Sequence, residues 1–167
     1  GRVSTPRQHN NSRVHQMRTL EESLIRLSVD YIDIWQLHGF DPHTNFHETA
    51  DVLARMIDSG KVRYIGVSNF SAWQLTHLQS HLPAGSLLHA AQYEYSLLQR
   101  GIEREVLPAA SSLGIGMLAW SPLGRGVLTG KYRNSIPADS RAASPHWGAF
   151  TRALMTESHR PIVEALA

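Results

Sequence analysis

Four short runs of apolar and β-branched residues recur along the chain and predict four strands. The runs cover residues 31–38, 62–69, 89–95 and 115–120. Their starts lie 31, 27 and 26 residues apart. Between the runs, apolar residues recur every three to four positions, as on one face of an α-helix. Strands that are joined by helical crossovers must run parallel, so the chain reads as successive βα units.

The predicted helices have recognisable ends. Their apolar stripes cover residues 14–27, 46–57, 75–82 and 106–113. Ser12 and Ser71 stand where an N-cap would accept a hydrogen bond from the first turn. Gly60 and Gly114 stand just past two of the helices, where a left-handed residue commonly ends a helix. These signals place each helix between two strands or before the first one.

The repeat length indicates the class of fold. Eight units of this length add up to the roughly 250 residues that are typical of a (β/α)₈ barrel. We therefore expect an α/β fold, a partial (β/α)₈ TIM barrel of about four consecutive βα units, with residues 1–167 forming an incomplete barrel domain. Residues 121–146 are rich in Ser, Pro, Gly and Arg and predict one long loop. Helical patterns follow at 149–155 and 161–167.

The composition indicates a folded domain and excludes sites that depend on cysteine. The chain has 42% hydrophobic residues and a formal net charge of +2, which is typical of a folded domain and not of a disordered one. It has no cysteine, which excludes disulfides, thiolate metal sites and a cysteine nucleophile. No apolar stretch reaches the ~18–20 residues of a membrane span, and the polar start lacks the apolar core of a signal peptide. We expect a cytoplasmic protein with no membrane partner.

The basic residues do not indicate a nucleic-acid partner. They comprise 14 Arg and only two Lys, scattered singly along the chain. A phosphate backbone needs a stripe or cluster of such charges, and none is present.

Polar side chains and one large aromatic follow the predicted strands. His38, Ser68-Asn69, Gln92 and Trp120 come at or near the carboxyl ends of the four runs. In parallel α/β folds the binding and catalytic groups gather at these ends and in the loops that follow them. The set suits a flat ligand with an amide group better than a hydrolytic reaction. Taken singly, Ser and Asn are also ordinary helix caps, and a tryptophan is more often part of a core.

Three separate segments resemble the aldo-keto reductases, which are NAD(P)H-dependent (β/α)₈-barrel enzymes. The segments are residues 31–38 (YIDIWQLH), 60–70 (GKVRYIGVSNF) and 120–132 (WSPLGRGVLTGKY). They occur in the order and spacing of that family. Residues 136–143 (IPADSRAA) also resemble its bacterial and channel-subunit-like branches. The resemblance runs from about Ser12 to about Ala167.

The resemblance assigns roles at the ends of the first three predicted strands. His38 matches the active-site histidine, whose imidazole N–H helps to bind the oxygen of the substrate carbonyl. Ser68, Asn69 and Gln92 match the residues that hold the nicotinamide carboxamide. The implied cofactor is NADP(H), with NAD(H) as the alternative, and the implied partner is a small carbonyl substrate.

The resemblance also assigns roles around the predicted loop. Trp120 matches the aromatic residue that stacks on the nicotinamide ring. Ser121, Leu123, Gly124 and Gly126 match the segment around the cofactor pyrophosphate, so residues 121–146 are expected on the cofactor side. Small residues there let backbone N–H groups approach an anion.

Other family motifs do not occur in this sequence. The family's general-acid tyrosine, its lysine and its aspartate lie in motifs that precede residues 31–38, and the adenosine 2′-phosphate site lies on a later strand. We expect the intact protein to be an oxidoreductase that reduces aldehydes or ketones, and the 167 residues alone to show no such activity. Two alternatives remain open: a non-catalytic interaction protein of the channel-subunit type, and a half-barrel that forms a homo-oligomer through its exposed edges.

Two histidine pairs raise the question of a metal site. His43 and His47, and likewise His77 and His81, lie four residues apart, which places two imidazoles on one helical face. Neither pair has a third ligand at a suitable spacing in the sequence. We therefore expect no metal.

Overall fold

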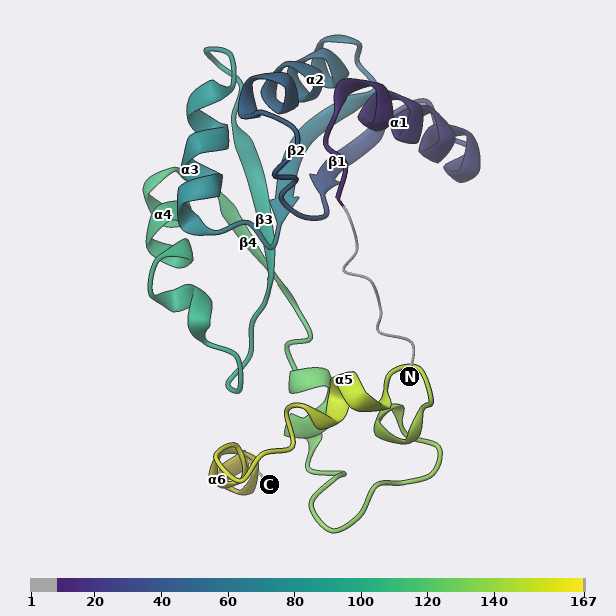
Figure 1. The fold of residues 1–167 in the computed structure, drawn as a ribbon, viewed down its shortest axis with the longest axis vertical. Helices are drawn as coiled ribbons and strands as arrows, with labels where there is room; N and C mark the ends of the chain where they lie inside the picture. Colours follow the sequence, from purple (N-terminus) through teal and green to yellow (C-terminus); the bar gives the residue numbers. More distant parts are fainter. Residues whose placement is uncertain (1–8, 167) are drawn as a thin grey trace. The chain divides into compact units, whose positions relative to one another are not determined.

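The computed structural model describes residues 9–166, which form a parallel sheet with helices and a separate region of short turns (Figure 1). The strands are β1 (Ile32–Leu37), β2 (Val62–Ser68), β3 (Leu88–Glu94) and β4 (Gly116–Trp120). The α-helices are α1 (Arg13–Leu27), α2 (Phe46–Asp58), α3 (Ala72–His81), α4 (Val106–Ser112), α5 (Gly148–Arg152) and α6 (Arg160–Leu166). Three 3₁₀ turns lie at Gly101–Glu103, Gly124–Thr129 and Arg141–Ala143. None of the described helices has the length and apolar character that a membrane span requires.

The sheet confirms the predicted βα units. Its strand order is β1-β2-β3-β4, and the pairs β1–β2 and β2–β3 are parallel. This is the arrangement of consecutive units in a partial (β/α)₈ barrel. Gly66 of β2 pairs with Ala90 of β3, and a Cβ atom on Gly66 would lie 2.7 Å from the Ala90 carbonyl oxygen. The register therefore requires glycine at that position.

By its internal contacts the chain divides into two compact units. The strand–helix unit comprises Gly1–Gln92 and Arg104–Leu118. The loop unit comprises Tyr93–Glu103 and Ala119–Ala167.

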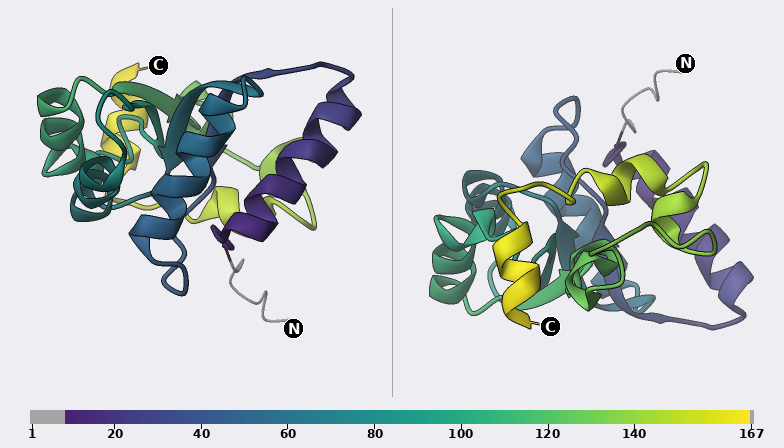
Figure 2. Two further views of the ribbon diagram at one scale, coloured as in Figure 1. Left: turned by 90° about the horizontal axis from the view of Figure 1, so that it is seen from above. Right: turned by 90° about the horizontal axis from the view of Figure 1, so that it is seen from below.

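The core of the strand–helix unit lies between the sheet and helices α1 to α4. Figures 1 and 2 show these helices following one another in sequence order along one side of the sheet, and neighbouring helices contact each other. Ile65, Val67 and Leu75 are completely buried there. On the strands, Ile34 and its partner Tyr64 remain 43% and 47% exposed. One face of the sheet is thus packed and the other presents apolar side chains to solvent.

The helices begin and end near the predicted residues, but the two serine hydroxyls do not make the expected capping bonds. Gly60 and Gly114 adopt the left-handed conformation, with φ of 73° and 68°. Ser71 is the N-cap of α3, and its backbone N–H donates to the Gln74 side chain at 2.8 Å, while its own hydroxyl has no hydrogen-bond partner among the described residues. Ser12 is the N-cap residue of α1 but makes no side-chain capping bond, and its hydroxyl donates to Asn10 Oδ1 at 2.6 Å. Both serines therefore occupy the predicted N-cap positions without the expected hydroxyl bond.

The loop unit is more ordered than the single loop that was expected for residues 121–146. Two of the 3₁₀ turns fall inside that range, closed by local bonds such as Gly126 N–H to the Leu123 carbonyl at 3.0 Å. A small apolar cluster of Leu98, Val127, Leu154 and Val163 supports them. Turn-forming composition therefore produced short helical turns, because i to i+3 hydrogen bonds need only local residues.

Candidate functional site

The carboxyl ends of β1, β2 and β3 bring four predicted residues together. Ser68 Oγ donates to the Gln92 carbonyl at 3.0 Å, and the Asn69 backbone N–H donates to the same oxygen at 3.1 Å. The Asn69 side-chain amide lies 2.9 Å from Ser68 Oγ and donates to the His38 carbonyl at 3.3 Å. Asn69 has a φ of 58°, a conformation that asparagine adopts more readily than most residues. These bonds fix the backbone around the site and make one cluster of His38, Ser68, Asn69 and Gln92.

The side chains of this cluster leave groups for a ligand. The His38 imidazole is exposed, with the His9 ring edge-on at 5.4 Å between centroids. The Gln92 amide is half-buried and makes no hydrogen bond within residues 9–166. An amide offers both a donor and an acceptor, which matches a carboxamide ligand.

A buried carboxylate holds the segment that follows His38. Asp41 accepts from the Asn11 N–H and the His43 N–H, each at 2.9 Å, and from the Thr44 hydroxyl at 2.6 Å. Burial alone would raise the pKa of Asp41, but the hydrogen bonds from Thr44, Asn11 and His43 lower it below the usual value. The chain that carries His38 is thus anchored by an ionised side chain.

The loop unit supplies a turn with an unusual backbone just after β4. Ser121, Gly124, Arg125 and Gly126 all have positive φ, between 52° and 94°. A Cβ atom on Gly124 would lie 2.9 Å from the flexible end of the Leu98 side chain, and its φ of 57° also favours glycine. At Gly126 a Cβ atom would meet nothing closer than 3.5 Å, and the Gly126 N–H already donates to the Leu123 carbonyl at 3.0 Å.

A cavity of about 450 Å³ opens beside this turn and is basic. Its lining comprises Ser121, Pro122, Leu123, Arg125, Gly126, Thr129, Lys131 and Arg141. No carboxylate lines it. No ion pair joins Lys131 or Arg141 to an acidic residue in the part of the chain that the structure describes. The Thr129 hydroxyl donates to the Gly126 carbonyl at 2.8 Å. The two cations without acidic partners and the Ser121 hydroxyl therefore form the donor set for a phosphate-type anion.

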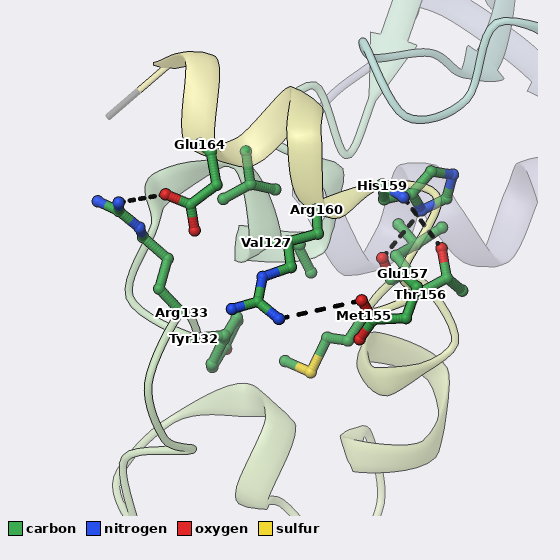
Figure 3. A pocket seen from close by; sticks show the side chains of 11 residues that line it. Val127, Tyr132, Arg133, Met155, Thr156, Glu157, His159, Arg160 and Glu164 are labelled. Atoms are coloured by element: carbon green, nitrogen blue, oxygen red, sulfur yellow. Dashed lines mark hydrogen bonds and ion pairs between the residues drawn. The ribbon is translucent and has the colours of Figure 1, made fainter.

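A second cavity in the loop unit has a different character (Figure 3). It measures about 160 Å³ and also contains two arginines. However, Arg133 pairs with Glu164, and Arg160 lies 3.9 Å from Glu157. Because its charges are paired, this cavity is a poorer anion site than the one beside Ser121.

The aromatic residue at the end of β4 lies in the same unit. The Trp120 ring is stacked with that of Phe150 at 6.3 Å between centroids and 18° between planes. A flat ring held in this way can support a flat ligand.

Comparison with known proteins identifies the family of this chain. The sequence model of the aldo/keto reductase family matches residues 2–167. The chain belongs to this family. Aldo/keto reductases are oxidoreductases that generally use NAD(P)H, and the four parallel strands with their helices form part of the family's barrel.

Several relatives are more than a third identical to this chain over the residues that match. The uncharacterized oxidoreductase YrpG of Bacillus subtilis is 43% identical over 145 residues, which are 86% of this chain and 42% of that protein. L-glyceraldehyde 3-phosphate reductase of Escherichia coli K12 is 37% identical over 78% of this chain and 38% of its own length. A probable voltage-gated potassium channel subunit beta of rice is 39% identical over 90% and 48%. The chain thus spans less than half the length of these relatives.

This aldo/keto reductase chain has two candidate binding regions, one in each unit. The strand-end cluster offers the His38 imidazole and the Gln92 amide, and the loop cavity offers two cations without acidic partners among the described residues. Lys131 and Arg141 were missing from the predicted site, which named Ser121, Leu123, Gly124 and Gly126 in that loop. The signal for both was present in the matching segments 120–132 and 136–143.

Two tyrosines near the end of β3 have raised pKa values. Burial raises the pKa of Tyr93 to about 12. The Tyr95 hydroxyl donates to Glu103 at 2.8 Å, and this bond raises the pKa of Tyr95. Neither hydroxyl is placed to give up a proton readily near neutral pH.

Three of the paired histidines lie near one another, although His47 is distant from the other two in sequence. The His81 ring lies 4.5 Å from that of His77 and 6.0 Å from that of His47, between centroids. Across residues 9–166, no group of three or more histidines and carboxylates has a geometry that could hold a metal ion.

Proposed function

We propose that the protein containing this chain transfers hydride between NAD(P)H and an aldehyde or ketone. The observation that supports this most is the basic cavity of the loop unit, whose Lys131 and Arg141 have no acidic partners among the described residues. Such a site suits the diphosphate of a dinucleotide. NADP(H) is the proposed cofactor, with NAD(H) as the alternative.

The strand-end cluster would orient the nicotinamide. Its carboxamide needs both a donor and an acceptor, which the Gln92 amide offers, while Ser68 and Asn69 hold the strand ends around it through their bonds to the Gln92 and His38 carbonyls. A fixed carboxamide determines which face of the ring delivers the hydride. The Trp120 ring would support the nicotinamide from one side, a contact worth about 0.5–1.5 kcal/mol beyond the buried area.

His38 would bind the substrate. When bound, the cofactor supplies the hydride. An imidazole N–H from His38 would donate to the carbonyl oxygen and stabilise the negative charge that develops there. A single donor of this kind is worth about 10²–10³ in rate in other enzymes.

A non-catalytic role in a channel complex is the second candidate. The rice relative named as a potassium channel subunit beta is 39% identical over 90% of this chain. Both candidates would use the barrel, and they differ in whether the intact protein turns over a carbonyl substrate. Steady oxidation of NADPH by an aldehyde would separate them.

Calorimetric titration of the chain with NADP⁺ tests the cofactor site. We expect Lys131→Gln and Arg141→Gln each to weaken binding about tenfold, which corresponds to about 1.4 kcal/mol. Arg133→Gln is the matched control, because it removes an equal charge from the same unit but from an ion pair with Glu164. Equal losses in all three variants would show a general charge effect and overturn the proposed site.

A further inference from the structure

Arg125 stands in the middle of the proposed pyrophosphate turn, yet its charge is already engaged. Its Nε donates to Glu94 Oε1 at 2.5 Å and one terminal nitrogen donates to Oε2 at 2.6 Å. The two side chains are only 10% and 16% exposed. A two-point bond between an arginine fork and a carboxylate is strong and directional, and burial shields it from screening by salt.

The remaining groups of Arg125 are also engaged, all within the loop unit. Its other terminal nitrogen donates to the Phe150 carbonyl at 2.6 Å. The guanidinium carbon lies 3.5 Å from the centroid of the Phe150 ring, a cation–π contact. That ring is the one that is stacked with Trp120. Arg125 therefore joins the end of β3, the turn after β4 and helix α5.

We propose that Arg125 is a positioning residue for the cofactor site and not one of its anion ligands. Together with Glu94 it forms a clamp that holds the Trp120–Phe150 stack and the turn of residues 121–126. The anion then meets Lys131 and Arg141 in the basic cavity. This inference rests on the proposed function for its ligand, but the clamp itself is a property of the protein without a ligand.

The clamp and the ligand roles predict opposite effects for Glu94→Gln. If Arg125 bound the anion, removal of the Glu94 charge would free a guanidinium and lower the local negative charge, so affinity would rise. If Arg125 and Glu94 form a clamp, the same variant loosens the turn and affinity falls. Arg125→Lys separates the roles again, because lysine keeps the charge but cannot form the two-point bond or the flat stack.

The test uses the 167-residue chain, inorganic pyrophosphate as the probe, and ¹⁵N-labelled tryptophan. We expect Glu94→Gln, Arg125→Lys and Arg125→Gln each to weaken pyrophosphate binding about tenfold. The double variant Glu94→Gln/Arg125→Gln should bind no more weakly than Arg125→Gln, because the two residues act together. Tighter binding by Glu94→Gln, or wild-type affinity in Arg125→Lys, would overturn the proposal.

A second readout needs no ligand. The indole signal of Trp120 should shift in all three single variants, while that of Trp35, in β1, stays in place and reports correct folding. If the wild-type chain binds no pyrophosphate, the proposed function fails, and the Trp120 signal still decides the clamp. An unchanged Trp120 signal in Glu94→Gln and Arg125→Lys would contradict it.

Discussion

The strand–helix unit and the loop unit hold their candidate binding groups by different means. In the strand–helix unit, Ser68 and Asn69 are fixed by bonds to the Gln92 carbonyl at the end of a packed sheet. In the loop unit, the turn after β4 depends on one ion pair, Glu94–Arg125, and on a small apolar cluster. Hydrogen bonds at the end of a sheet thus hold the candidate residues of one unit, and contacts between side chains hold those of the other. Substitutions should therefore affect the two units differently.

Truncation of a buried leucine should give the largest difference in stability between the two units. Leu75 is completely buried in the strand–helix unit and Leu154 is 3% exposed in the loop unit, so Leu→Ala is the same chemical change in both. We expect Leu75→Ala to cost about 2–5 kcal/mol of unfolding free energy and to lower the main thermal transition. Leu154→Ala should mainly speed amide exchange in residues 121–146.

Amide exchange and calorimetry together check this pair. In the wild type, exchange in residues 121–146 should be faster than in β2, because the loop unit buries fewer apolar side chains. Equal protection of the two segments, or an equal loss of the main transition in both variants, would remove the distinction between the units.

Self-association should depend on the exposed face of the sheet. Ile34 and Tyr64 are 43% and 47% exposed there, and burying several hundred Å² of apolar surface is worth several kcal/mol at about 25 cal/mol per Å². We propose that a second copy covers this face, so that the chain sediments as a dimer at micromolar concentration. Ile34→Lys should shift it toward monomer. Ile25→Lys, on α1 and 78% exposed, is the control.

The outcome that contradicts this association is a compact wild-type monomer with a sharp thermal transition. It would mean that no second copy packs against the exposed apolar face of the sheet. The strand–helix unit would then be self-sufficient.

A smaller effect on the free energy of unfolding is expected from substitution of Asp41, which anchors the segment after His38. Its pKa is lowered in the folded state, so its contribution to stability is full above the unfolded value of about 3.9 and is lost as the pH falls through the folded pKa. Asp41→Asn should cost about 1–3 kcal/mol at pH 6 and progressively less below pH 4. Urea unfolding between pH 3 and 6 measures this, with Asp139→Asn, at an exposed position, as the control. A cost that does not change with pH would show that the charge of Asp41 is unimportant.

The sequence predicted the four strands because their apolar runs and crossover helices are local patterns. It predicted the cluster of His38, Ser68, Asn69 and Gln92 for the same reason, since parallel strands bring their carboxyl ends to one edge. It did not predict the partners of charged residues. Glu94 and Arg125 lie 31 residues apart, and only the folded chain shows that they pair. Both Lys131 and Arg141 lie in the matching segments 120–132 and 136–143, but only the folded chain shows that neither pairs with a described acidic residue.

The most direct measurement uses partial ligands and follows backbone amides by NMR. The account predicts that inorganic pyrophosphate shifts the amides of residues 121–126 and of Lys131 and Arg141. Nicotinamide mononucleotide should shift those of Ser68, Asn69 and Gln92, and NADP⁺ should shift both sets with one affinity. If pyrophosphate instead shifts the amides around Arg133 and Arg160, or if NADP⁺ shifts neither set, the account of the cofactor site is wrong.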